Sequence, residues 1–126
     1  MKTSGTDNFE DLLWSASVAL TAAINTVPQH SGVYLFGGLT RIAGVEVQLD
    51  PLYIGRAVNL RKRLAQHYSQ RRDLGWRSQI PKGQIVVVRW SSVLLADIAS
   101  VEVSLIRTLS PKFNVINYSG GLIKAD

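Results

Sequence analysis

Two strand-like runs that follow one another directly constrain the fold of this chain more than any other feature. The first covers Ser31–Phe36 and ends at Gly37-Gly38, and the second starts near Val45, alternates in hydropathy and ends at Gly55. Because glycine-containing turn residues separate them, the two runs are predicted to form an antiparallel hairpin. Pro51 lies inside the second run and predicts a sheet edge or a bulge there, since proline cannot donate a ladder hydrogen bond.

The rest of the chain alternates helix-like and strand-like patterns. It predicts one further, β-branched strand and three helices, the last of them stopped by Pro111. A chain of 126 residues is long enough for one hydrophobic core but short for two. We therefore predict a single α+β domain in which helices flank a short antiparallel sheet of about three strands. The predicted elements are a helix over 7–27, the hairpin, a helix over 57–69, a basic loop over 70–83, a strand over 85–90, a helix over 94–109 and an irregular or weakly extended tail. The core is predicted over 28–116 and the tail over 117–126.

The apolar stretch Leu12–Val27 is predicted to be an extra amino-terminal amphipathic helix that covers the core. It is too short and carries too many Ser, Thr and Asn residues to span a membrane. Asp7 and Glu10 form a pattern typical of a capping box, and Pro28 closes the helix. Acidic rather than basic residues precede the apolar part, so we predict no signal peptide, no membrane contact and a cytoplasmic protein.

Composition and charge narrow the chemistry. The chain has no cysteine, which excludes disulfides, thiolate zinc sites and cysteine nucleophiles, and its two histidines leave little material for a histidine metal cage. Fourteen Lys and Arg residues against nine Asp and Glu residues give a net charge of +5. Eight of the fourteen cations lie close together, which is typical of a contact with a nucleic-acid backbone, the alternative being a solvated helix face and loop. This basic block comprises Arg56, Arg61, Lys62, Arg63, Arg71, Arg72, Arg77 and Lys82.

Glu102 is the most informative residue of the last predicted helix. It falls inside the apolar stripe of that helix, between Ile98 and Ile106. An ionised carboxylate in such a position is costly unless a cation meets it. Two partners remain open, a buried arginine or a divalent metal. With one acid available, the metal would be Mg²⁺-like, keeping most of its waters and using phosphate oxygens as further ligands.

Polar residues also follow one face of the helix predicted over 57–69. Arg56, Asn59, Arg63 and His67 are spaced by three, four and four residues, so they share a face beside the apolar stripe of that helix. Two arginines and a histidine in this arrangement favour a phosphate site, the alternative being a solvated basic face. Arg61 and Lys62 point elsewhere, and for them the solvated face is favoured.

The aromatic residues have a packing interpretation as well as a functional one. Tyr34 and Tyr53 each lie in a strand next to glycine, and strand tyrosines usually pack in the core. The tryptophans are predicted to be core or loop anchors, although one of them, in the basic loop, could stack on a base. They are Trp14, Trp76 and Trp90.

Taken together, these residues resemble the GIY-YIG nuclease family. Gly32-Val33-Tyr34 is similar to its first motif, with Val for Ile, and Tyr53-Ile54-Gly55 is its second motif. Arg63 and Glu102 stand where the family has a helix arginine and a metal-binding glutamate, and Pro111-Lys112-Phe113-Asn114 resembles its closing Pro-Lys-Tyr-Asn. The resemblance covers roughly Val27 to Val115.

Two features depart from the family pattern. Tyr34 and Tyr53 are 19 positions apart, longer than in the compact family hairpin, which predicts an insertion over residues 38–50. At His67 many members, including the excision-repair nuclease domain, have tyrosine, whereas restriction enzymes of the family are more similar to this chain. His67 therefore favours a restriction-like site.

The resemblance implies metal-dependent hydrolysis of DNA phosphodiester bonds. Glu102 would hold one Mg²⁺ or Mn²⁺ ion per active site, and this ion would neutralise the phosphate and help the 3′ oxygen to leave. Arg63 would bind the non-bridging oxygens as charge builds on them, and Arg56 would contact a phosphate.

The same resemblance gives roles to the remaining polar residues. Tyr34 would act as the base for the attacking water and Tyr53 would position water or phosphate, although which tyrosine is the base stays open. His67 would take the proton onward, and Asn114 would orient the site by hydrogen bonds.

A second function stays open beside the endonuclease. The same basic cleft would also suit a nucleic-acid-binding module that does not cut, directed by a partner protein. A homodimer or a targeting protein would supply specificity, and the sequence leaves repair, restriction, recombination and homing all open as biological roles.

Overall fold

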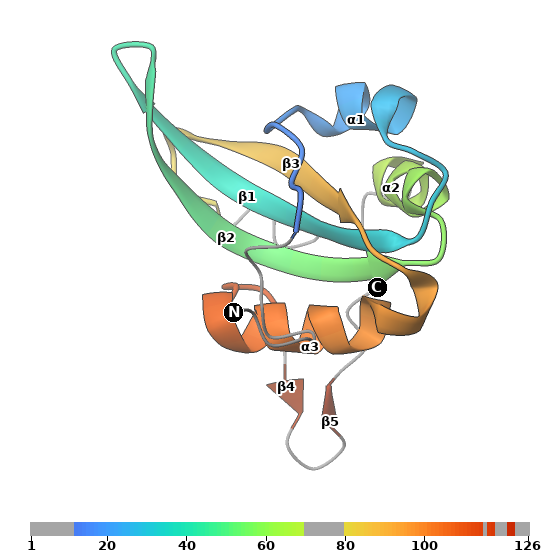
Figure 1. Ribbon diagram of the computed structural model, residues 1–126. Coiled ribbons are helices and arrows are strands. Elements are labelled where there is room, and N and C mark those ends of the chain that lie inside the picture. The colour runs from blue at the N-terminus through green and yellow to red at the C-terminus, as the bar shows by residue number, and fades with distance from the viewer. Residues whose placement is uncertain (1–11, 70–79, 115, 118–120, 123–126) are drawn as a thin grey trace, which may run out of the picture.

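The computed structural model describes residues 12–69, 80–114, 116–117 and 121–122 (Figure 1). A three-stranded sheet forms its centre, with helices on both faces, as predicted for an α+β domain. In chain order the elements are α1 Leu20–Thr26, β1 Gly32–Ile42, β2 Val45–Ala57, α2 Leu60–Ser69, β3 Gln84–Ser92, the short 3₁₀ helix η3 Leu95–Asp97, α3 Ile98–Leu109, β4 Ile116–Asn117 and β5 Gly121–Leu122.

The predicted hairpin is confirmed and is longer than expected. β1 and β2 pair antiparallel from Gly32↔Ala57 to Ile42↔Val45, and β3 pairs with the other edge of β1, so the strand order is β2-β1-β3. The prediction that Gly37-Gly38 ends the first strand is wrong. A Cβ atom at Gly37 would lie 2.6 Å from Cδ1 of Leu49, so this glycine makes room for a side chain of β2 inside a continuous strand.

Pro51 lies at a bulge, as its position predicts. Phe36 pairs with Tyr53, whereas the next residue, Gly37, pairs with Pro51, which leaves Leu52 as the extra residue of β2. β2 is also an edge strand of the sheet. The missing N–H of Pro51 therefore removes no hydrogen bond from the centre of the sheet.

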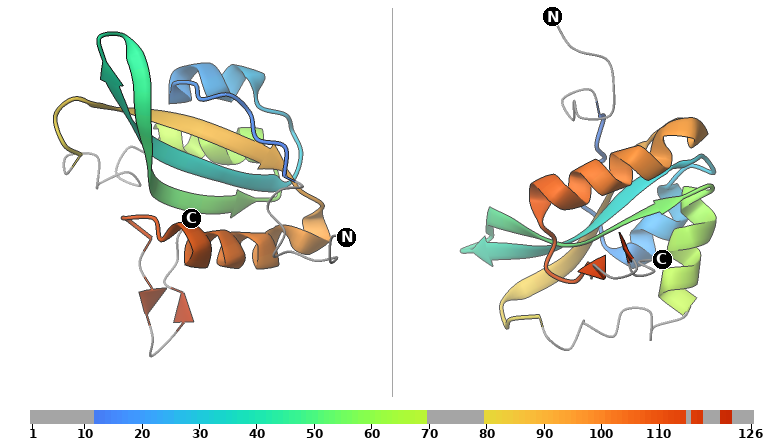
Figure 2. Two further views of the ribbon diagram at one scale, coloured as in Figure 1. Left: turned by 60° about the vertical axis from the view of Figure 1, so that its left-hand side comes forward. Right: turned by 90° about the horizontal axis from the view of Figure 1, so that it is seen from below.

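Two hydrophobic cores lie on opposite faces of the sheet (Figures 1 and 2). α3 covers one face, and α1 and α2 cover the other. Because successive strand residues point to opposite faces, Val33 and Leu35 pack toward α3, whereas Tyr34 and Phe36 pack toward α1 and α2. Trp14 and Trp90 are partly buried against the two cores, which confirms their packing role, and Trp76 lies outside the described residues.

The prediction of a helix over 7–27 is wrong for much of that range. α1 begins only at Leu20, and the preceding described residues run along the edge of β3 instead. The N–H of Ser15 donates to the carbonyl of Trp90 at 2.8 Å, and Val18 and Val88 exchange two hydrogen bonds of 3.1 and 2.7 Å. The open edge of β3 offers these backbone groups partners that the local helical pattern does not reveal. The predicted capping residues Asp7 and Glu10 lie outside the described residues.

The two longer helices match their predictions with shifted starts. α2 begins at Leu60 because β2 continues to Ala57, and the side chain of Asn59 accepts a hydrogen bond of 3.1 Å from the N–H of Lys62. α3 is preceded by the turn η3 and ends where Ser110 adopts a left-handed conformation with φ 48°, directly before Pro111. In the part of the chain that the structure describes, none of these helices has the length and apolar character needed to cross a bilayer.

Candidate active site

Tyr34 lies across the hairpin from Gly55, and the absence of a side chain at Gly55 makes room for its ring. The two residues are register partners, and a Cβ atom at Gly55 would overlap Cζ and Oη of Tyr34. Tyr34 is fully buried, so its ring cannot move out of the way without disturbing the core. The two glycine-tyrosine motifs are therefore two halves of one packing arrangement.

This arrangement predicts that Gly55→Ala is destabilised by about 1–3 kcal/mol, because an added methyl group would displace a buried ring. The free energy of unfolding from urea titration measures the effect. Gly38→Ala is the matched control, because its Cβ would meet the flexible end of the Gln84 side chain. Equal stability of the two variants would contradict this account of Gly55.

Tyr34 and His67 form a buried hydrogen-bonded pair. Tyr34 Oη lies 2.7 Å from His67 Nε2, and His67, on α2, is 2% exposed. The ring of Tyr53 lies 6.0 Å from the His67 ring and 6.4 Å from the Tyr34 ring, between centroids. The structure thus brings together three predicted site residues, and the tyrosines also pack in the core as their strand positions indicate. A phenol in contact with an imidazole nitrogen can pass a proton to it.

Glu102 projects from α3 and is 1% exposed, which confirms its predicted place inside the apolar stripe. Its Oε1 atom lies 2.9 Å from Nη1 of Arg56, which follows the second glycine motif on β2. Of the two partners that the sequence left open, the structure therefore holds the arginine. A buried carboxylate with a cation that reaches it from the surface avoids the cost of an uncompensated charge.

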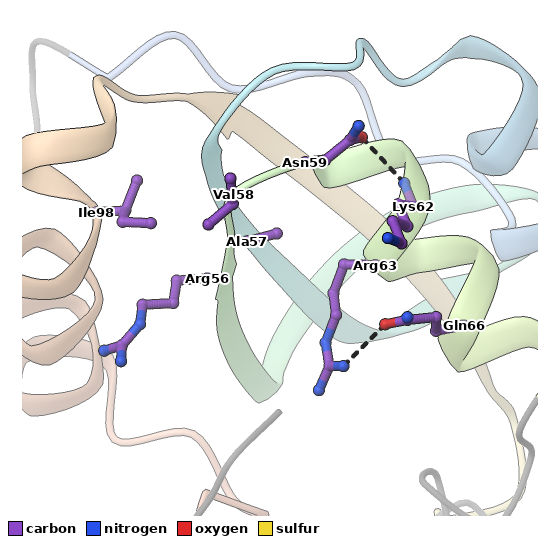
Figure 3. A pocket seen from close by; sticks show the side chains of 8 residues that line it. All are labelled: Arg56, Ala57, Val58, Asn59, Lys62, Arg63, Gln66 and Ile98. Carbon is purple, nitrogen blue, oxygen red and sulfur yellow. Dashed lines mark hydrogen bonds between the residues drawn. The ribbon is translucent and has the colours of Figure 1, made fainter.

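Arg56 and Arg63 line one pocket of about 400 Å³ between α2 and α3 (Figure 3). Arg56 reaches it from β2, beside α3, whereas Arg63 reaches it from α2 and donates a hydrogen bond of 3.0 Å to Oε1 of Gln66. Three cationic side chains and no acidic one are among its lining residues, so the pocket suits an anionic group. The lining residues are Arg56, Ala57, Val58, Asn59, Lys62, Arg63, Gln66 and Ile98.

The other predicted nucleic-acid contacts are less concentrated. Lys62 lines the pocket, but Arg61 faces α1, where its Nε donates a hydrogen bond of 2.9 Å to the carbonyl of Val27. Lys82 is exposed and lies just before β3, at the end of the sheet where Gln84 pairs with Thr40. The pocket lies at the other end, near Gly32, and Gly32 and Thr40 are about 26 Å apart along β1. Arg71, Arg72 and Arg77 lie outside the described residues.

Asn114 holds the β2 strand at the point where it carries the site. Its Oδ1 accepts a hydrogen bond of 2.7 Å from the N–H of Ile54, and its Nδ2 donates one of 2.9 Å to the carbonyl of the same residue. The amide side chain thus acts as a strand neighbour for the residue between Tyr53 and Gly55. These two bonds hold the backbone of β2, and the predicted role of Asn114 in orienting the active site stays a prediction.

Replacing Asn114 with alanine is expected to lower the free energy of unfolding by about 1–3 kcal/mol, because a backbone N–H and a carbonyl lose their partners. Thermal unfolding measures the loss. Lys112→Ala is a suitable control, since Lys112 is exposed, its bond to Pro51 uses its backbone N–H, and its side chain contacts the Phe113 ring rather than the backbone of β2. A change no larger than that of Lys112→Ala would show that the Asn114 amide does not hold β2.

The donor set at Glu102 fits a hard divalent cation. Among the described residues, no group of three His, Cys, Asp or Glu side chains could enclose a metal. One buried carboxylate next to a pocket for anions instead suits an ion such as Mg²⁺, which keeps several waters and takes phosphate oxygens as further ligands.

Gln66 is the site residue that the sequence reasoning missed. It lines the pocket and accepts the hydrogen bond from Arg63. Its position three residues after Arg63 is a neighbouring position on a helix face, so this spacing could have identified it.

Known proteins of similar sequence and fold support the resemblance that these motifs carry. No family model matches the chain. It is 32% identical to UvrABC system protein C from Hydrogenobaculum sp. (strain Y04AAS1) over 103 residues, a match that covers 77% of this chain. It is 33% identical to the same protein from Aquifex aeolicus (strain VF5) over 102 residues, a match that covers 78% of this chain. It spans only 16% of the length of each of these relatives.

The fold is similar to that of a related UvrC domain. The solved GIY-YIG N-terminal endonuclease domain of UvrC from Thermotoga maritima, bound to its catalytic divalent cation, magnesium, superposes with a TM-score of 0.50 at 23% identity and covers 76% of this chain and 96% of that one. The chain therefore has the fold of a GIY-YIG endonuclease domain. His67 favours a restriction-like site, whereas the relatives named above are UvrC proteins, so the restriction-like subtype stays a prediction.

Proposed function

We propose that this GIY-YIG domain is a divalent-metal-dependent endonuclease that hydrolyses DNA phosphodiester bonds. The observation that carries the proposal is the buried carboxylate of Glu102, whose arginine partner opens onto a pocket lined by cations. The UvrC domain with the same fold is described as an endonuclease with a catalytic magnesium ion, which supports both the activity and the metal.

The cations of the pocket and the buried Glu102 beside it have complementary roles in this reaction. Arg63 binds the non-bridging oxygens of the phosphate and stabilises the charge that builds on them in the transition state. Glu102 would hold the metal, and a divalent ion bound there would supply Lewis-acid stabilisation of the phosphate and of the departing 3′ oxygen. Arg56 and Lys62 bind neighbouring phosphates of the backbone, in the pocket that they share with Arg63.

Tyr34 and His67 handle the proton of the attacking water. Tyr34 Oη accepts this proton while it gives its own to His67 Nε2, to which it is already hydrogen-bonded at 2.7 Å. No free phenolate is needed, which avoids the difficulty that an ordinary tyrosine has a pKa of about 10. Tyr53 positions the water or the phosphate.

A binding module without catalysis is the alternative. It would use the same cations, but it would have no use for a buried acid and a buried phenol–imidazole pair. DNA is the proposed partner in either case, and a homodimer, a targeting protein and a cytoplasmic location stay predictions.

Cleavage of end-labelled oligonucleotides tests the proposal. The protein is incubated with duplex, single-stranded, flap and branched DNA in Mg²⁺ or Mn²⁺, and products with 5′-phosphate and 3′-hydroxyl ends are expected. Retention of DNA on a gel without any cleavage, steeply weakened by salt, would instead support the binding module.

A further inference from the structure

Arg56 and Glu102 form an ion pair whose two members lie in different environments. The Glu102 side chain is 2% exposed, whereas that of Arg56 is 41% exposed and lines the basic pocket (Figure 3). The half-exposed guanidinium lies on the solvent side of the pair, whereas the carboxylate is buried. We propose that Arg56 is the counter-ion that Glu102 keeps until a divalent cation replaces it, so that Arg56 and the metal compete for this carboxylate.

Electrostatics predicts that the Arg56 ion pair weakens the binding of a metal at Glu102. Removing the cationic partner of a buried carboxylate is destabilising, so Arg56 stabilises the metal-free protein. A divalent ion at Glu102 supplies the same compensation with twice the charge, and two cations close to one carboxylate repel each other. Metal binding must therefore work against the Arg56 ion pair, and this lowers the apparent metal affinity of the wild-type protein.

The exchange also accounts for the placing of Arg56 on the pocket wall. If a metal binds the Glu102 carboxylate, the Arg56 guanidinium is released toward the pocket that it shares with Arg63 and Lys62, where the proposed phosphate lies. This inference rests on the proposed function, because it assigns the metal to Glu102.

The inference is tested with Arg56→Gln, which removes the charge and keeps a polar side chain. Two opposite effects are expected. Without metal, the variant should have a lower melting temperature than the wild type. Its Kd for Mn²⁺, measured by isothermal titration calorimetry without DNA, should be about tenfold lower than that of the wild type, equivalent to about 1.4 kcal/mol. A rise in melting temperature with Mn²⁺ that is larger than in the wild type is expected for the same reason.

Further variants complete the experiment. Arg41→Gln removes one member of an exposed Arg41–Glu46 pair of 3.4 Å on the hairpin and should leave the Mn²⁺ affinity unchanged. Arg56→Lys keeps the positive charge and should bind Mn²⁺ less tightly than Arg56→Gln does. Arg56→Met also removes the charge and takes the place of Arg56→Gln if that variant does not fold.

The outcomes separate this inference from the proposed function. Equal or weaker Mn²⁺ binding by Arg56→Gln than by the wild type, or Mn²⁺ binding by Arg56→Lys as tight as that by Arg56→Gln, would overturn the competition. Because the readout is metal binding without DNA, a protein that shows the expected exchange but cuts no DNA would support the inference and contradict only the endonuclease.

Discussion

Replacing Glu102 with glutamine is expected to lower the rate of metal-dependent DNA cleavage at least about 10³-fold, because a catalytic metal contributes several kcal/mol of transition-state stabilisation. Glutamine has nearly the same shape as glutamate, and its amide oxygen can still accept a hydrogen bond from Arg56. It lacks the negative charge that holds a hard divalent cation. The rate of plasmid nicking at saturating Mg²⁺ measures the loss.

The fold and the DNA contacts should survive this change. Circular dichroism and gel retention of DNA report on them separately from catalysis, since the proposed phosphate contacts come from Arg56, Lys62 and Arg63. Glu46→Gln is the matched control, because Glu46 is an exposed acid on the hairpin. Cleavage by Glu102→Gln at the rate of Glu46→Gln would remove Glu102 from the mechanism.

Replacing Tyr34 with phenylalanine is expected to lower the cleavage rate by about 10²–10⁴-fold, the usual contribution of a positioned general base. Phenylalanine keeps the buried ring over Gly55 and removes only the oxygen that lies 2.7 Å from His67 Nε2. The expected loss is therefore in turnover at saturating substrate, with DNA affinity retained. Single-turnover cleavage of a labelled duplex measures it.

Tyr68→Phe provides the comparison, because Tyr68 follows His67 on α2 but is exposed. Its cleavage rate should equal that of the wild type. Tyr53→Phe decides which tyrosine is the base. If Tyr53→Phe lost more activity than Tyr34→Phe, the proton route through His67 would be wrong.

The parts of the fold that the sequence predicts are those set by local patterns. The existence of the hairpin follows from two strand-like runs in succession with glycines between them, although not the length of its first strand, and α3 follows from an apolar stripe that Pro111 ends. Glu102 was predictable as a special residue because its helix places it among apolar neighbours, a property of α3 alone.

What the sequence could not predict depends on contacts between distant parts of the chain. Residues 12–19 lie along β3 because that strand offers an open edge, and no local signal outweighs the helical pattern there. The partner of Glu102 lies 46 positions away on β2, so spacing alone could not choose between Arg56 and a metal. The two hydrogen bonds of Asn114 to the backbone of Ile54 likewise appear only when the chain returns to the edge of β2.

Conversion of supercoiled plasmid to its nicked form tests the central claim most directly. The purified protein is incubated with plasmid in Mg²⁺, in Mn²⁺ and in excess EDTA, and Glu102→Gln is treated in the same way. The account predicts nicking by the wild-type protein that requires the metal and disappears in the variant. Nicking that continues in EDTA or in Glu102→Gln, or plasmid that is bound but never cut, would contradict it.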